Sequence, residues 1–80
     1  MYFVYILRSE VDSNKLYYGK TTDLKSRLKR HNSKHNASTA DGAPWKVAWY
    51  GCFDNSSIAT AFEKYLKTAS GKAFARKRLL

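Results

Sequence analysis

Five side chains of this sequence have chemistry that suits a phosphate group: two phenols, a guanidinium, an imidazole and a carboxylate. They belong to Tyr5, Tyr17, Arg27, His31 and Glu63. A guanidinium holds phosphate oxygens with its planar fork and stabilises negative charge that develops on phosphorus. An imidazole donates a proton or a hydrogen bond to the same group. Each residue alone is more often structural, and only their joint placement indicates a phosphate site.

The stretch YYGKTTDLKSRLKRH, residues 17–31, brings three of these groups into fifteen residues. A short strand ends in Gly19, and three residues that favour a helix N-terminus follow it, Thr21, Thr22 and Asp23. In the helix that comes next, Arg27 and His31 are four residues apart and share one face. We therefore expect a phosphate cradle built from a phenol, a tight glycine and an Arg/His pair.

Glu63 is the only carboxylate between Asn55 and the end of the sequence, among six basic side chains. Its structural interpretation is an i,i+4 ion pair with Lys67. Its functional interpretation is a metal ligand, because Mg²⁺ often binds one carboxylate together with phosphate oxygens and water. A two-metal phosphodiesterase needs several clustered carboxylates, and the chain has only six Asp and Glu. If the protein cuts phosphodiesters, we expect one Mg²⁺ or Mn²⁺ per site.

Tyrosines serve as general bases only where cations or metal-bound water lower the phenol pKa from about 10. The basic surroundings would provide this for Tyr5 or Tyr17, although tyrosine is also an ordinary strand residue. The sequence has no HExxH, CxxC, glycine-rich nucleotide loop or Ser/His/Asp signature.

The charge balance favours a polyanionic partner. Fifteen Lys and Arg against six Asp and Glu give a net charge of +9, spread along the chain. Such a field attracts nucleic acid, since neutralised phosphates release condensed counterions, although it also serves solubility or a membrane surface. The basic residues that we expect to contact nucleic acid are Lys20, Lys25, Arg30, Lys72 and Arg76.

Eighty residues make one domain, residues 1–80, with an α/β (α+β) architecture. Apolar and β-prone runs predict strands over residues 2–8, 15–20 and 45–53, the first two forming an antiparallel hairpin. Helical spacing predicts one helix over about 24–34 and a second that starts near residues 55–57 and ends at Gly71. A short basic helix follows over 72–80, and residues 36–44 form an exposed loop.

Three further features bear on location and packing. Cys52 is the lone cysteine, expected to be a buried thiol, so no intrachain disulfide forms. The N-terminal MYFVYIL is neither a signal peptide nor a spanning helix, which makes a cytoplasmic protein without membrane contact the default. Trp45 and Trp49 share one strand parity and are expected in the core, or else on a surface that recruits a partner. His35 is interpreted as an ordinary surface histidine.

The motif pattern resembles the GIY-YIG nuclease family. The resemblance rests on Phe3-Val4-Tyr5, on Tyr17-Tyr18-Gly19, on the Arg and His that follow, and on a Glu in a later helix. Within the family the chain is most similar to small stand-alone bacterial proteins related to the nuclease domain of the excision-repair subunit UvrC. The resemblance implies a central three-stranded antiparallel β-sheet flanked by helices.

The resemblance also implies hydrolysis of DNA phosphodiesters by water with a single divalent metal. Carried over by position, Tyr5 and Tyr17 would be the motif tyrosines, one of them assisting as general base. Arg27 and His31 would hold the scissile phosphate, and Glu63 would bind Mg²⁺ or Mn²⁺. The expected enzyme selects DNA structure rather than sequence, in repair or recombination, with a protein partner that supplies targeting.

Two departures from the family pattern keep a second hypothesis open. Phe3 and Tyr18 replace a glycine and an isoleucine, neither of which does chemistry. No Asn follows Asn55, whereas many members have one after the glutamate helix, so Lys72 or the backbone would supply that contact. The alternative is a basic nucleic-acid-binding module that keeps the fold without turnover.

Overall fold

The computed structural model describes residues 1–33 and 37–80 and has a three-stranded antiparallel sheet at its centre. The strands are β1 (Tyr2–Ser9), β2 (Leu16–Thr21) and β3 (Trp45–Phe53), in the order β2-β1-β3. The helices are α1 (Leu24–Asn32), α2 (Ala37–Ala40), α3 (Ser56–Leu66) and α4 (Ala69–Arg78). The predicted α+β fold and its antiparallel sheet are confirmed.

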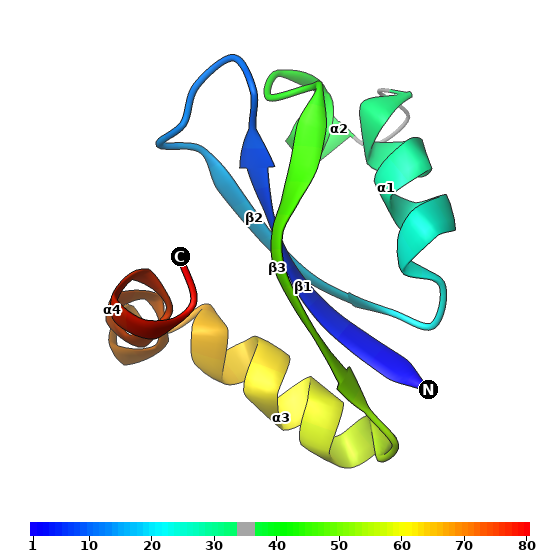
Figure 1. The fold of residues 1–80 in the computed structure, drawn as a ribbon, viewed down its shortest axis with the longest axis vertical. Helices are drawn as coiled ribbons and strands as arrows, with labels where there is room; N and C mark the ends of the chain where they lie inside the picture. The colour runs from blue at the N-terminus through cyan, green and yellow to red at the C-terminus, as the bar shows by residue number, and fades with distance from the viewer. Residues whose placement is uncertain (34–36) are drawn as a thin grey trace.

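Helices cover both faces of the sheet, with α1 and α2 on one side and α3 and α4 on the other (Figure 1). The middle strand β1 is apolar on both alternating sets, as a strand covered on two faces requires. Val4 and Ile6 pack toward α3 and α4, whereas Tyr5 and Leu7 pack toward α1. All four side chains are fully buried, so β1 separates two small cores.

Short polar side chains start the three longer helices. The Asp23 carboxylate accepts from the Ser26 N–H at 3.1 Å, and the Asn55 side chain accepts from the Ile58 N–H at 3.0 Å. Both residues were among the expected caps. Among the described residues, no helix has the length and apolar character that crossing a membrane requires.

The predicted end of the second long helix is wrong. Helix α3 stops at Leu66, and Gly71 lies inside the first turn of α4, where its N–H donates to the Thr68 hydroxyl at 3.0 Å. A Cβ at this glycine would overlap the Tyr65 carbonyl oxygen and lie 2.5 Å from the carbonyl carbon. Gly71 therefore allows a close approach of α4 to the end of α3 and does not terminate a helix.

The segment expected to be an exposed loop is also different in part. It contains α2, Thr39 is fully buried, and Trp45 Nε1 donates to the Thr39 carbonyl at 2.7 Å. This short helix forms because it covers one end of the core around Trp45. The first long helix ends at Asn32, and the predicted continuation to Lys34, like His35, lies outside the described residues.

Two predictions about β3 are wrong: Trp45 and Trp49 do not share a face, and Cys52 is not buried. Ile6 pairs with Trp49 but Leu7 pairs with Val47, so a bulge adds one residue to β3. This reverses the side-chain alternation, and Trp45 packs on the α1 face while Trp49 packs on the α3 face. Both tryptophans belong to the cores and share no surface. Cys52 is exposed, since this edge strand extends beyond the α1 core.

Candidate functional site

Tyr5 and Tyr17 lie together on the α1 face of the sheet. Tyr5 pairs with Gly19 and Leu7 pairs with Tyr17, so the two tyrosines are diagonal neighbours with ring centroids 6.4 Å apart. The Tyr5 ring crosses over Gly19, where a Cβ would overlap the phenol oxygen and lie 2.5 Å from Cζ. The absence of a side chain at residue 19 is thus what admits the Tyr5 ring between β1 and α1.

His31 meets both tyrosines from α1. Its Nε2 lies 3.0 Å from the Tyr5 hydroxyl, and its ring centroid lies 4.7 Å from that of Tyr17. On the other side, Nδ1 lies 3.1 Å from the Thr39 hydroxyl. The His31 side chain is 1% exposed, so it is an internal link between the middle strand and α2.

Burial sets the protonation of this pair. The pKa of Tyr5 is raised from 10.0 to about 12, chiefly by burial and then by the neighbouring Tyr17, while Arg27 opposes the shift. The expected lowering by cations is therefore wrong for Tyr5, because desolvation outweighs the nearby guanidinium. The pKa of His31 is lowered by burial and by the charges of Arg27 and Arg30. Both groups are neutral near pH 7.

A neutral imidazole has one N–H and one acceptor nitrogen, so the directions of its two hydrogen bonds depend on each other. If Tyr5 donates to Nε2, then Nδ1–H donates to Thr39, and in the opposite sense Thr39 donates to Nδ1 and Nε2–H donates to Tyr5. Either way, Tyr5 and Thr39 act at the two ends of one relay through His31.

Arg27 reaches the same point from one turn earlier on α1. Its side chain is half-buried, and its charge opposes the rise in the pKa of the Tyr5 phenol. The backbone N–H of Arg27 donates to the Asp23 carbonyl at 3.1 Å, so the capped start of α1 holds it in place. The structure thus brings together four of the five predicted residues, Tyr5, Tyr17, Arg27 and His31.

Glu63 belongs to α3, on the other face of the sheet. Lys20 Nζ on β2 donates to the Thr60 hydroxyl at 2.6 Å, which ties the turn before Glu63 to the strand that carries Gly19. The Glu63 side chain is 19% exposed and pairs with Lys67 at 3.3 Å. Its charge contributes to the raised pKa of Tyr5. The predicted ion pair with Lys67 is confirmed, and the charge of Glu63 also acts on Tyr5.

A divalent ion has one credible protein ligand here. Within residues 1–33 and 37–80, no three His, Cys, Asp or Glu side chains form a group that could hold a metal. The carboxylate of Glu63 fits the pattern of Mg²⁺, which takes one or two carboxylates and fills its other positions with water and substrate phosphate oxygens.

The basic residues predicted to contact nucleic acid lie on both sides of the sheet. Lys25 and Arg30 are exposed on α1, and Lys72 and Arg76 are exposed on α4. Lys20 is half-buried and engaged with Thr60. These cations therefore do not make one flat patch, and a bound polyanion would have to pass around an edge of the sheet.

Sequence reasoning missed two residues near these sites. Thr39 was assigned to a loop, although its hydroxyl contacts His31; no local signal in NASTADGAP indicates that contact. Arg8 was treated only as the last residue of the first strand. It follows Val4 and Ile6 on the same face of β1 and is the one basic residue there. A charged side chain on an otherwise apolar strand face could have indicated a binding role for Arg8.

Comparisons with known proteins agree with this arrangement. The family model of the GIY-YIG catalytic domain matches residues 1–78. The chain is 34% identical over 68 residues to a UPF0213 protein of Haloquadratum walsbyi, covering 84% of this chain and 74% of that protein. It is 37% identical over 68 residues to a UPF0213 protein of Clostridium perfringens, covering 84% and 71%. A UPF0213 protein of Vibrio campbellii is 34% identical over 65 residues, covering 80% and 61%.

Proposed function

The chain belongs to the GIY-YIG catalytic-domain family, and from this premise we propose that it is a metal-dependent endonuclease that hydrolyses phosphodiester bonds in DNA. Membership gives a nuclease-type domain, while the names of the relatives state no activity. The observation that carries the proposal is the meeting of Tyr5, Tyr17, Arg27 and His31 beside Gly19. A role in DNA repair or recombination, in the cytoplasm, is part of the same proposal.

Arg27 is the residue proposed to hold the scissile phosphate. Its charge acts on the Tyr5 phenol and its side chain is only half-buried, which leaves the residue accessible to a ligand. A guanidinium aimed at the phosphate is worth most where charge develops in the transition state. His31, buried and neutral, would support this centre by holding Tyr5.

The two tyrosines would have different tasks. Tyr5 has no exposed surface and a pKa raised to about 12, so at neutral pH it keeps its proton and serves to position His31 rather than to act as a base. Tyr17 is half-buried at the edge strand β2 and contacts the His31 ring. We therefore assign Tyr17, and not Tyr5, to contact and orient the attacking water.

Glu63 would hold a single Mg²⁺ or Mn²⁺, which would neutralise charge on the phosphate and leaving oxygen. To bind the ion, its carboxylate must share or release Lys67. The remaining ligands would come from water and from DNA, so we expect metal binding to be weak without substrate.

The proposal is tested by incubating the pure protein with labelled single-stranded, duplex, flap and branched DNA in Mg²⁺, Mn²⁺ or EDTA. Metal-dependent cutting is expected, with a preference for a DNA structure rather than a sequence. Glu63→Gln and Arg27→Gln should reduce cutting at least a hundredfold. Glu10→Gln and Arg78→Gln are matched controls, because both residues are exposed and outside the candidate site.

Retained cutting in Glu63→Gln or Arg27→Gln would refute the assignment. If a protein partner supplies targeting, the protein should cut fewer kinds of DNA structure when that partner is added. The residual cutting of the variants should be compared at equal folded fraction, measured by circular dichroism, so that misfolding is not taken for lost catalysis.

A second function has one structural observation in its favour. The Glu63 carboxylate is already paired with Lys67, and the sequence has no Asn after Asn55. A basic module that binds nucleic acid without turnover would show this combination. Binding that survives EDTA, with no cutting in either metal on any DNA, would favour that module over the nuclease.

A further inference from the structure

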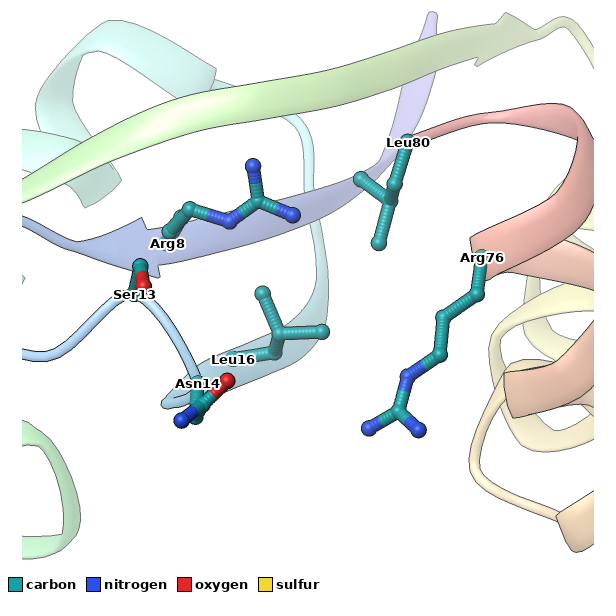
Figure 2. A pocket seen from close by; sticks show the side chains of 6 residues that line it. All are labelled: Arg8, Ser13, Asn14, Leu16, Arg76 and Leu80. Atoms are coloured by element: carbon teal, nitrogen blue, oxygen red, sulfur yellow. The ribbon is translucent and has the colours of Figure 1, made fainter.

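A basic hollow lies on the α3/α4 side of the sheet, beside the β1–β2 hairpin. Its volume is about 290 Å³, and it is lined by Arg8, Ser13, Asn14, Leu16, Arg76 and Leu80. Figure 2 shows Arg8 extending from β1 and Arg76 from α4 into the same hollow from different sides. Two arginines from separate elements thus line one space.

Arg8 is held in a position that favours an anion. It pairs in register with Leu16 on β2 and with Lys46 on β3, so its backbone is fixed in the middle of the sheet. Its Nε is buried and has no hydrogen-bond partner, the one such side-chain nitrogen or oxygen in the described part of the chain. A buried donor without a partner is unfavourable, so a ligand that accepts a hydrogen bond from it would be bound more tightly.

The acidic residues nearby do not neutralise this pair. Among the described residues the recorded ion pair is that of Lys67 with Glu63, so neither arginine has a carboxylate partner there. In the hairpin, the Asp12 carboxylate accepts from the Asn14 N–H at 3.0 Å and does not line the hollow. Ser13 and Asn14 instead offer a hydroxyl and an amide as further donors.

We propose that this hollow, the Arg8/Arg76 pocket, binds a backbone phosphate of nucleic acid away from the Tyr5 centre. The choice of nucleic acid as the ligand rests on the proposed function, since a nuclease must also bind its substrate away from the bond that it cuts. Two planar guanidiniums with adjacent polar donors match a phosphate better than any neutral ligand. The net charge of +9 draws polyanions to the surface.

The position of the pocket agrees with a continuous path for the ligand. Leu16 and Gly19 are three residues apart on β2, which is about 10 Å along a strand. Successive phosphates of one duplex strand are spaced by about 3.4 Å along the helix axis. Because β2 is an edge strand, a polynucleotide that follows this edge would reach Gly19 on one face and the pocket on the other.

The test is equilibrium binding of a fluorescent duplex oligonucleotide, measured by anisotropy in EDTA over a series of salt concentrations. Arg8→Gln and Arg76→Gln are each expected to weaken binding several-fold and to lower the slope of log K against log [salt] by about one. Arg78→Gln is the matched control, since it removes the same charge from α4 outside the pocket.

The double variant gives the sharper prediction. If both arginines hold one phosphate, Arg8→Gln/Arg76→Gln should bind little worse than either single variant, because the effects share a partner. Independent, additive losses would overturn the single-phosphate pocket. Arg76 is exposed, so Arg76→Gln remains informative even if Arg8→Gln lowers stability in a thermal melt.

The outcomes separate this inference from the nuclease assignment. Binding in EDTA does not require turnover, so weakened binding in a protein that never cuts DNA would support the pocket while the nuclease fails. Pocket variants that bind DNA as Arg78→Gln does would overturn the pocket, even with metal-dependent cutting intact. Loss of binding to an acidic peptide alone, with DNA binding unchanged, would show a carboxylate site and overturn it as well.

Discussion

The phenol oxygen of Tyr5 and Nε2 of His31 lie 3.0 Å apart, in a contact that excludes solvent from both side chains. The bond joins β1 to α1, and through Nδ1 it continues to Thr39 on α2. Residues from three parts of the chain therefore depend on one neutral imidazole. A change at either end should alter both folding and the geometry around Gly19.

Tyr5→Phe should destabilise the protein by about 1–3 kcal/mol, because it leaves a buried imidazole nitrogen without its partner. Urea denaturation measures this loss. Tyr50→Phe is the control, since Tyr50 is 54% exposed and its change should stay within about 0.5 kcal/mol. Equal stabilities for the two variants would show that the Tyr5–His31 bond contributes nothing.

Gly19→Ala should be destabilising by about 1–3 kcal/mol, since the new methyl group would displace the Tyr5 ring. The double-mutant cycle with Tyr5→Ala isolates the cause. Once the ring is removed, Gly19→Ala should cost little, and the coupling energy should account for most of the single-variant effect. Additive losses would mean that residue 19 is restricted by something other than Tyr5.

Gly51→Ala is the matched control on β3. There a Cβ would lie 2.8 Å from the outer edge of the Trp49 indole, and Trp49 is half-buried, so it has more room to shift than the fully buried Tyr5 ring. Its cost should be smaller than that of Gly19→Ala in the same urea experiment.

Alkaline stability should report the burial of Tyr5. The folded pKa is about 12 against 10.0 for the free side chain, so the unfolded chain loses this proton first. Below pH 10 the contribution is constant, and between pH 10 and 12 it falls by roughly 1.4 kcal/mol per unit. The stability advantage of the wild type over Tyr5→Phe should therefore shrink as the pH rises from 9 to 12. An advantage that stays constant over that range would contradict the raised pKa.

Lowering the pH should also destabilise the protein, in this case through His31. Its folded pKa is lowered by burial and by neighbouring arginines, so the unfolded state takes up the proton first as the pH falls below about 6.5. The unfolding free energy of the wild type should drop between pH 7.5 and 5.5. In His31→Gln this part of the pH dependence should be missing; its persistence would assign the effect to another group.

Much of the fold was predictable because it depends on local pattern. The double-sided apolar run around Val4 to Leu7 predicted the middle strand, and Asp23 and Asn55 predicted two helix starts. The bulge that turns Trp49 to the other face was not predictable, because one extra residue leaves no mark in an unbroken β-prone run. The prediction that Gly71 ends a helix was wrong for a related reason. A glycine that ends a helix and a glycine that allows close packing against another backbone segment look alike in sequence.

The proximity of Tyr5, Tyr17, Arg27 and His31 could be expected from the sequence, but the electrostatics of this cluster could not. The spacing of Arg27 and His31 on one helix brings them to the same place as Tyr5. That Tyr5 and His31 are buried depends on α2 and β3, which come later in the chain and cover them through Thr39 and Trp45. Desolvation is a tertiary property, so the sequence indicated cationic surroundings but not the raised pKa of Tyr5.

Lys67 should compete with a metal for Glu63. The two side chains are 3.3 Å apart, with Lys67 exposed and the Glu63 side chain 19% exposed. Surface i,i+4 pairs contribute only about 0.3–0.5 kcal/mol to stability, so Lys67→Gln should leave the melting temperature nearly unchanged. Removing the ammonium frees the carboxylate, and the Mn²⁺ concentration that gives half-maximal cutting should fall several-fold.

Lys64→Gln is the control for that experiment, since it removes the same charge from an exposed neighbour on α3 that forms no recorded ion pair among the described residues. A general electrostatic effect on the metal would shift both variants alike. A shift confined to Lys67→Gln requires the ion to share the Glu63 carboxylate with that lysine. If the half-maximal Mn²⁺ concentration is unchanged in both, Glu63 is not the metal ligand and its role is the ion pair alone.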